Sequence, residues 1–94
     1  MQKATLIFSD RTDLSDRGVI EMKIWRVPVS VPPSDHGLKY SLYFGRDGER
    51  IVGYDNERGK GDHKHIRGQE QPYQFVSVRQ LVDDFKADVE RNRT

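Results

Sequence analysis

The stretch 38–55 reads LKYSLYFGRDGERIVGYD, and it decides the fold. Its first half alternates between apolar and polar side chains, with an apolar series of Leu38, Tyr40, Leu42 and Phe44. A period of two residues is typical of a strand with one buried face. The segment 45–48, Gly-Arg-Asp-Gly, has the composition of a hairpin loop. We therefore expect a second strand over 49–55 that returns antiparallel to the first.

Two further strands are expected upstream of this hairpin. Residues 3–9 form a compact β-prone run, and residues 19–27 alternate with Ile20, Met22 and Ile24 on one face. The apolar phase changes at Trp25, which predicts a β-bulge near that residue, because one extra residue exchanges the two faces of a strand. The polar residues 10–17 are expected to separate the two strands. Prolines make 28–37 an extended connector.

The last quarter of the chain predicts a helix. Ser77 is a natural N-cap, Gln80 stands where it would complete a capping box, and Val76 and Leu81 have the spacing of a hydrophobic staple. An apolar stripe follows with helical period: Val78, Leu81, Val82, Phe85 and Val89. Five charged residues of the same segment are expected to face water: Asp83, Asp84, Lys86, Asp88 and Glu90. The stripe needs an apolar partner, and the even-numbered face of the sheet provides one.

The expected fold is therefore α+β, an antiparallel β-meander of four to five strands packed against one C-terminal α-helix. The length of 94 residues predicts a single domain over 1–94. The chain has no cysteine, which excludes disulfides and thiolate metal sites and favours a cytoplasmic location. No apolar run approaches the roughly 20 residues that span a bilayer, so no membrane partner is expected. A net charge of +1 means that any site for a polyanion must come from local clustering of charge.

Such a cluster occurs at 58–67, where Asp62 is the one acidic residue among four basic ones: Arg58, Lys60, Lys64 and Arg67. The same segment holds His63 and His65. If 62–66 is extended, both imidazoles project from one face about 7 Å apart, and Asp62 and Lys64 point to the opposite face. Two imidazoles at this spacing can stand on either side of a phosphodiester, one as base and the other as acid. The pentavalent phosphorane formed during cleavage carries extra negative charge. A nearby cation would stabilise it: Arg58, Lys60 or Arg67.

Other interpretations of this segment are a solvated hairpin tip and a metal site in which Asp55 or Asp62 joins the two histidines. A dication is disfavoured by three neighbouring basic residues: Lys60, Lys64 and Arg67. No metal or other cofactor is therefore expected. Tyr54 is expected to be a packed ring with its hydroxyl near Asp55, in preference to a base contact. His36, in the proline-containing connector, is expected at the surface.

The run 54–65, Tyr-Asp-Asn-Glu-Arg-Gly-Lys-Gly-Asp-His-Lys-His, resembles the signature of the TumE-like family of small bacterial toxins. The resemblance continues through 70–78 and the helix 81–89, and upstream it includes 25–28 and Tyr40. Lys64 stands where the family more often has arginine, a change that keeps the charge. The resemblance implies a toxin-like domain from a two-gene toxin–antitoxin module, whose cognate antitoxin usually carries a helix-turn-helix domain.

Carried over by position, the family motif points to seven residues: Tyr54, Asp55, Asn56, Lys60, Asp62, His63 and His65. Together with the loop chemistry, this predicts a metal-independent ribonuclease toxin with RNA as its substrate. The expected catalytic residues are His63, His65, Lys60 and Asp62. The expected substrate-binding residues are Arg58, Lys64, Arg67, Tyr54, Asp55 and Asn56. The alternative is a non-catalytic nucleic-acid- or protein-binding regulatory module. Under either function, the basic loop is a candidate surface for docking the antitoxin, and the helix face of Asp83, Asp84 and Asp88 is the competing surface.

Overall fold

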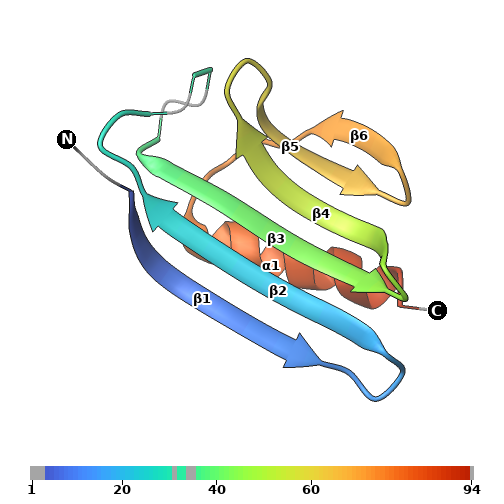
Figure 1. Ribbon diagram of the computed structural model, residues 1–94. Helices are drawn as coiled ribbons and strands as arrows, with labels where there is room; N and C mark the ends of the chain where they lie inside the picture. The colour runs from blue at the N-terminus through green and yellow to red at the C-terminus, as the bar shows by residue number, and fades with distance from the viewer. Residues whose placement is uncertain (1–3, 31, 34–35, 94) are drawn as a thin grey trace.

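The computed structural model describes residues 4–30, 32–33 and 36–93, which form one antiparallel sheet and one helix (Figure 1). Each strand pairs with its neighbour in the chain, in the order β1-β2-β3-β4-β5-β6. The strands are β1 (Thr5–Asp13), β2 (Gly18–Arg26), β3 (Leu38–Arg46), β4 (Glu49–Glu57), β5 (Gly61–Ile66) and β6 (Gln69–Pro72). The helix α1 (Val78–Arg91) follows β6 and lies across one face of the sheet.

The α+β class and the single C-terminal helix are confirmed, but the described sheet has six strands instead of four to five. The additional strand is β6, whose four residues, Gln-Glu-Gln-Pro, are all exposed and therefore carry no apolar period. The first strand is also longer than expected. It continues through the polar residues Asp10–Asp13, because ladder pairing with β2, and not burial, holds these residues.

The β-bulge was predicted in β2 but lies in the neighbouring strand β1. Pairing between β2 and β3 runs without interruption from Gly18 to Arg26, so the bulge expected in β2 is wrong. The register shift lies instead in β1, between Leu6 and Phe8, which pair with Trp25 and Ile24. The extra residue is therefore Ile7. Trp25 simply occupies the face of β2 that α1 does not cover.

The core lies between α1 and the even-numbered face of β2, β3 and β4. Its largest fully buried side chains come from both layers: Tyr40, Tyr54, Phe44, Phe85, Ile24, Leu42, Leu81 and Val52. Phe85 meets the ring of Tyr54 edge to face, with 5.7 Å between centroids. The apolar stripe of α1 therefore packs against the apolar face of the sheet, as its helical period predicted.

The N-cap of α1 forms as expected, but its supporting contacts do not. Ser77 Oγ accepts a hydrogen bond from the Gln80 backbone N–H at 3.1 Å. The Gln80 side chain, however, donates to Asp84 Oδ1 at 2.6 Å, so the reciprocal half of the capping box is replaced by a bond along the helix. Val76 is 69% exposed while Leu81 is fully buried, so the expected staple is not formed.

Asp88 was expected to face water and is instead 5% exposed. Its carboxylate accepts hydrogen bonds from the Tyr54 hydroxyl, from Lys64 Nζ at 3.1 Å and from Arg91. Burial by itself raises the pKa of Asp88, but these three hydrogen bonds outweigh it and hold the pKa below the usual value. An acidic side chain on the helical stripe is therefore part of the contact between helix and sheet. None of the described helices is long and apolar enough to cross a membrane.

The Phe85→Ala variant is expected to lose about 3–5 kcal/mol of unfolding free energy, because it removes a fully buried ring and leaves a cavity under the sheet. Val76→Ala, at an exposed position before the same helix, is the control and is expected to change stability by less than about 0.5 kcal/mol. Urea denaturation followed by circular dichroism measures both. Equal losses in the two variants would contradict this packing.

Candidate functional site

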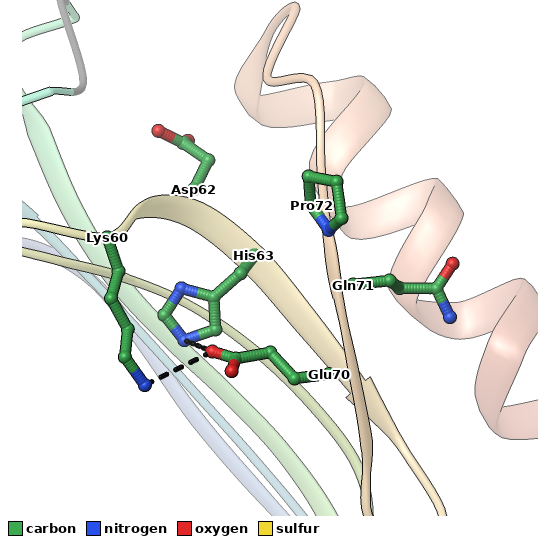
Figure 2. Close-up of a pocket in the computed structure, with 6 residues that line it drawn as sticks. All are labelled: Lys60, Asp62, His63, Glu70, Gln71 and Pro72. Atoms are coloured by element: carbon green, nitrogen blue, oxygen red, sulfur yellow. Dashed lines mark hydrogen bonds and ion pairs between the residues drawn. The ribbon is translucent and has the colours of Figure 1, made fainter.

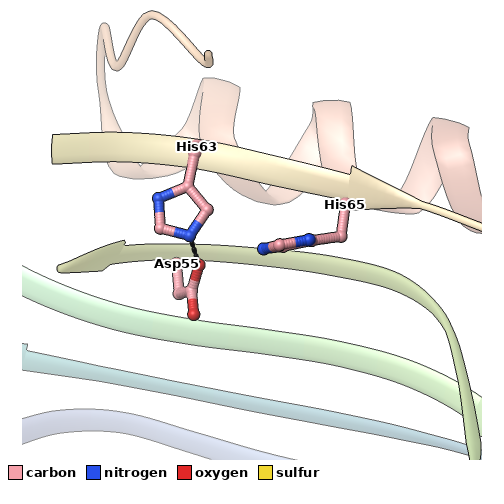
Figure 3. Close-up of side chains that lie close together, drawn as sticks. All are labelled: Asp55, His63 and His65. Carbon is pink, nitrogen blue, oxygen red and sulfur yellow. Dashed lines mark ion pairs between the residues drawn. The ribbon is translucent and has the colours of Figure 1, made fainter. Parts of the chain in front are cut away.

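The pairing of β4 with β5 positions the two histidines. Asp55 pairs directly with His63, and Gly53 pairs with His65. Because side chains alternate along a strand, His63 and His65 share the face that points away from α1 (Figure 3). Their ring centroids lie 5.1 Å apart, and the rings stand edge to face at 79°.

His63 is almost completely buried, with 3% of its surface exposed. Its Nδ1 lies 3.0 Å from the Gly61 carbonyl oxygen, which can only accept, so Nδ1 carries a hydrogen. Nε2 therefore faces Asp55, whose Oδ1 lies 2.6 Å away. The alignment of this contact falls short of a hydrogen bond, and both atoms are buried without another hydrogen-bond partner among the described residues.

Two more carboxylates surround His63. Glu70 Oε1 lies 3.6 Å from Nε2 of His63 and 3.8 Å from Nε2 of His65, and Glu57 Oε1 lies 3.9 Å from Nε2 of His63. Glu70 also pairs with Lys60 at 3.3 Å, and this hydrogen bond is the main reason that the pKa of Glu70 is lowered. The immediate surroundings of His63 are thus acidic, although its sequence neighbourhood is basic.

His65 is more open than His63 and lies next to a cation that sequence reasoning missed. Desolvation by burial lowers the pKa of His65, and electrostatic interactions with the neighbouring Arg50 and His63 lower it further. The stem of Arg50 crosses Gly53, where an added Cβ would lie 2.8 Å from Arg50 Cδ. The signal in the sequence was Gly53 itself, since a glycine inside a strand often marks close approach of another group.

A pocket of about 320 Å³ opens beside His63 (Figure 2). It is lined by Lys60, Asp62, His63, Glu70, Gln71 and Pro72. Figure 2 shows Lys60, His63 and Glu70 turned toward one another, while Asp62 projects away from them. His63 thus lines an open pocket, although only 3% of its surface is exposed.

The four basic residues of 58–67 do not converge on the histidines. Lys64 lies on the helix side, where Nζ contacts Asp88 at 3.1 Å and stands 5.6 Å from the centre of the Tyr54 ring. Arg67 is in the turn at the other end of β5 and donates to the Asn92 carbonyl at 3.0 Å. Arg58 is exposed in the turn between β4 and β5. Lys60 is the residue of this set that reaches the histidine cluster, through Glu70.

Tyr54 and Asn56 support the fold from inside. The Tyr54 ring is packed as expected, but its hydroxyl donates to Asp88 and not to Asp55. The Asn56 amide is fully buried; its Oδ1 accepts from the Tyr40 backbone N–H at 3.0 Å, and its Nδ2 donates to the Leu38 carbonyl at 2.8 Å. Neither side chain is accessible to a substrate, so the substrate-binding role expected for both is corrected to a structural one.

His36 belongs to a second cluster and is not a surface residue. Its side chain is 15% exposed, and its ring stacks on Phe75 with 4.0 Å between centroids. Asp62 Oδ2 lies 2.7 Å from His36 Nε2 and accepts a hydrogen bond from the Tyr40 hydroxyl, also at 2.7 Å. Asp62 therefore binds groups on the helix side of the sheet, while Asp55 is the carboxylate that contacts a catalytic candidate.

Three side chains of the outer face have the donor types and the spacing to hold a metal ion. Asp55, His63 and His65 each offer one ligand atom, and these atoms lie within 4.8 Å of one another. Of the two carboxylates considered from sequence, the structure thus brings Asp55 to the histidines.

Comparison with protein families gives a match to this chain. The family model described as "Toxin TumE" matches residues 2–93. No curated protein and no solved structure matches the chain.

The Asp88→Asn variant is expected to lose about 2–4 kcal/mol of unfolding free energy near neutral pH, because it leaves Lys64 beside a neutral group in a buried position. Asp83→Asn, an exposed carboxylate on the same helix, is the control. Because the pKa of Asp88 is lower in the folded than in the unfolded chain, its contribution is present above about pH 4 and is lost as the pH falls below that value.

Urea titrations between about pH 7 and pH 2 measure this difference. The wild type is expected to lose more stability across the acid range than Asp88→Asn does. Parallel acid curves for the two proteins would show that Asp88 carries no such linkage.

Proposed function

The chain belongs to the toxin TumE family, and on that premise we propose that it is the toxin of a two-gene module that cleaves RNA with His63 and His65 as an acid–base pair. The observation that supports this proposal is the placement of two imidazoles 5.1 Å apart on one face, beside an open pocket. That spacing lets both rings reach one phosphodiester.

The proposed reaction is a transesterification. The base removes the proton of a ribose 2′-hydroxyl, and the 2′ oxygen attacks the adjacent phosphorus. The bond from phosphorus to the 5′ oxygen breaks, and the acid gives that oxygen a proton. The products are a 2′,3′-cyclic phosphate and a free 5′-hydroxyl, so atoms and charge balance without an external reactant.

The surroundings of each ring favour a different role for each histidine. Burial and Arg50 lower the pKa of His65, so this ring is neutral near pH 7 and suits the base. His63 has an oxygen atom close to each ring nitrogen, the Gly61 carbonyl at Nδ1 and Asp55 Oδ1 at Nε2, and is proposed as the acid. Asp55 orients His63. Arg50 and Lys60 are the cations placed to stabilise the negative charge that develops on the phosphate.

Neutralisation by a cognate antitoxin follows from the toxin assignment, and we propose that this partner carries a helix-turn-helix domain and acts with the toxin in the cytoplasm. The second candidate function is that of a non-catalytic binding module, which the deep burial of His63 favours. The two differ in turnover, because a binding module shifts the mobility of RNA without cutting it.

Purified protein incubated with RNA and excess chelator is expected to produce cyclic-phosphate ends. His63→Gln and His65→Gln should each reduce the cleavage rate by about 100-fold or more, since general acid and base groups contribute on that scale. His36→Gln, the third histidine, lies outside the pair and is expected to keep the wild-type rate. Circular dichroism verifies that each variant is folded.

Expression under a tight promoter provides the cellular readout. The wild type should arrest growth, and the His63 and His65 variants should relieve the arrest. Undiminished toxicity in both variants would overturn the catalytic assignment. Retained RNA binding without cleavage at every protein concentration would establish the binding module.

A further inference from the structure

We infer that Asp55, His63 and His65 form a binding site for one divalent transition metal ion of the zinc type. Their ligand atoms already lie within 4.8 Å of one another. A tetrahedral zinc ion with bonds of about 2.0–2.1 Å needs its ligands roughly 3.4 Å apart, so the side chains must rotate to bring the three atoms to that spacing. Two imidazoles and one carboxylate form a ligand set that zinc proteins use, and they leave a fourth position open.

The unsatisfied atoms at the centre of the cluster point to a cation. His63 Nε2 and Asp55 Oδ1 face each other at 2.6 Å, and both are buried without a hydrogen-bond partner among the described residues. The His63 side chain is 4% exposed. A buried nitrogen lone pair opposite a carboxylate oxygen is costly unless a positive charge lies between them. A proton can supply that charge at this separation, and a metal ion can supply it once the two atoms move apart to the ligand spacing given above.

The structure already contains the outer contact that a histidine ligand needs. The hydrogen bond from Nδ1 of His63 to the Gly61 carbonyl fixes the ring so that Nε2 presents its lone pair to Asp55. Metal-binding histidines typically hold their second nitrogen in this way. The scaffold is also regular, because Asp55 and His63 are direct partners in the β4–β5 ladder and His65 is the next residue on the same face.

The charges around the cluster admit a dication, although the Arg50 guanidinium lies next to His65. Three carboxylates lie near the histidines: Asp55, Glu57 and Glu70. Lys64 and Arg67, which were expected to repel a metal, are engaged elsewhere by Asp88 and Asn92, and Lys60 is paired with Glu70. Imidazole ligands favour zinc and its neighbours over magnesium and calcium, which prefer oxygen.

One consequence rests on the proposed function. An ion held by both imidazoles removes them from proton transfer, so the metal-bound and acid–base states exclude each other. Zinc is therefore expected to inhibit the RNA cleavage proposed above.

Titration of the purified chain with Zn²⁺ in competition with a chromogenic chelator tests the site without reference to activity. The wild type is expected to bind one ion per chain. Asp55→Asn and His65→Gln should each weaken binding about 10-fold or more. Asp62→Asn is the matched control, since this carboxylate precedes His63 in sequence but contacts groups on the helix side, and it should bind Zn²⁺ as the wild type does.

Thermal denaturation provides an independent readout, because an ion that binds the folded chain raises its melting temperature. Zn²⁺ should raise it for the wild type and Asp62→Asn but not for Asp55→Asn, and Mg²⁺ should raise it for none of them. Equal Zn²⁺ affinity in the wild type and an Asp55→Asn, His65→Gln double variant would overturn the inference. So would equal loss in Asp62→Asn and Asp55→Asn.

Cleavage assays with and without Zn²⁺ separate this inference from the proposed function. Specific Zn²⁺ binding with no RNA cleavage in either condition would support the metal site and reject the ribonuclease. Cleavage in chelator with no specific Zn²⁺ binding would do the reverse. Cleavage that requires Zn²⁺ would support the site and reject the metal-free acid–base assignment.

Discussion

The register between β4 and β5 is the constraint on which the site depends. Asp55 stands opposite His63, and the alternation of β5 then places His65 on the same face and Lys64 on the other. A slip by one residue would turn both imidazoles toward α1 and bring Lys64 to the outer face. The ladder hydrogen bonds alone do not select between registers, so side-chain contacts must do so.

The helix side supplies that selection. Lys64 meets the buried carboxylate of Asp88, and Tyr54, its partner in the ladder, donates to the same group. One residue before His63, Asp62 accepts from Tyr40 and contacts His36. Each of these polar contacts would be lost in a shifted register, at the cost of buried groups without partners. The residues that hold β5 in place thus alternate with the two histidines of the candidate site.

The elements with a strong period were predictable, and the polar contacts between them were not. The strands around Leu42 and Met22 and the helix around Phe85 follow from spacing, because each has one face that must leave water. Residues of β6 lack that signal, since pairing alone orders them. Asp88 resembled a solvated helix residue because nothing local shows that Tyr54 and Lys64 converge on it. For the same reason, the sequence predicted more positive charge beside the histidines than the structure places there. Proximity in sequence does not determine which face of the sheet each basic side chain occupies.

The electrostatic balance at the outer face follows from this division between the two faces. Lys64 is drawn to the helix by Asp88, while Asp55, Glu57 and Glu70 remain around His63. Had the lysine and these carboxylates shared one face, they would have paired with one another and left the imidazole beside neutralised charges. Instead, His63 Nε2 lies 2.6 Å from Asp55 Oδ1, and both atoms are buried without a hydrogen-bond partner among the described residues, an arrangement that a small positive charge would stabilise. A proton and a transition metal ion are the two such charges that an imidazole accepts, and competition between them follows from the same pair of atoms.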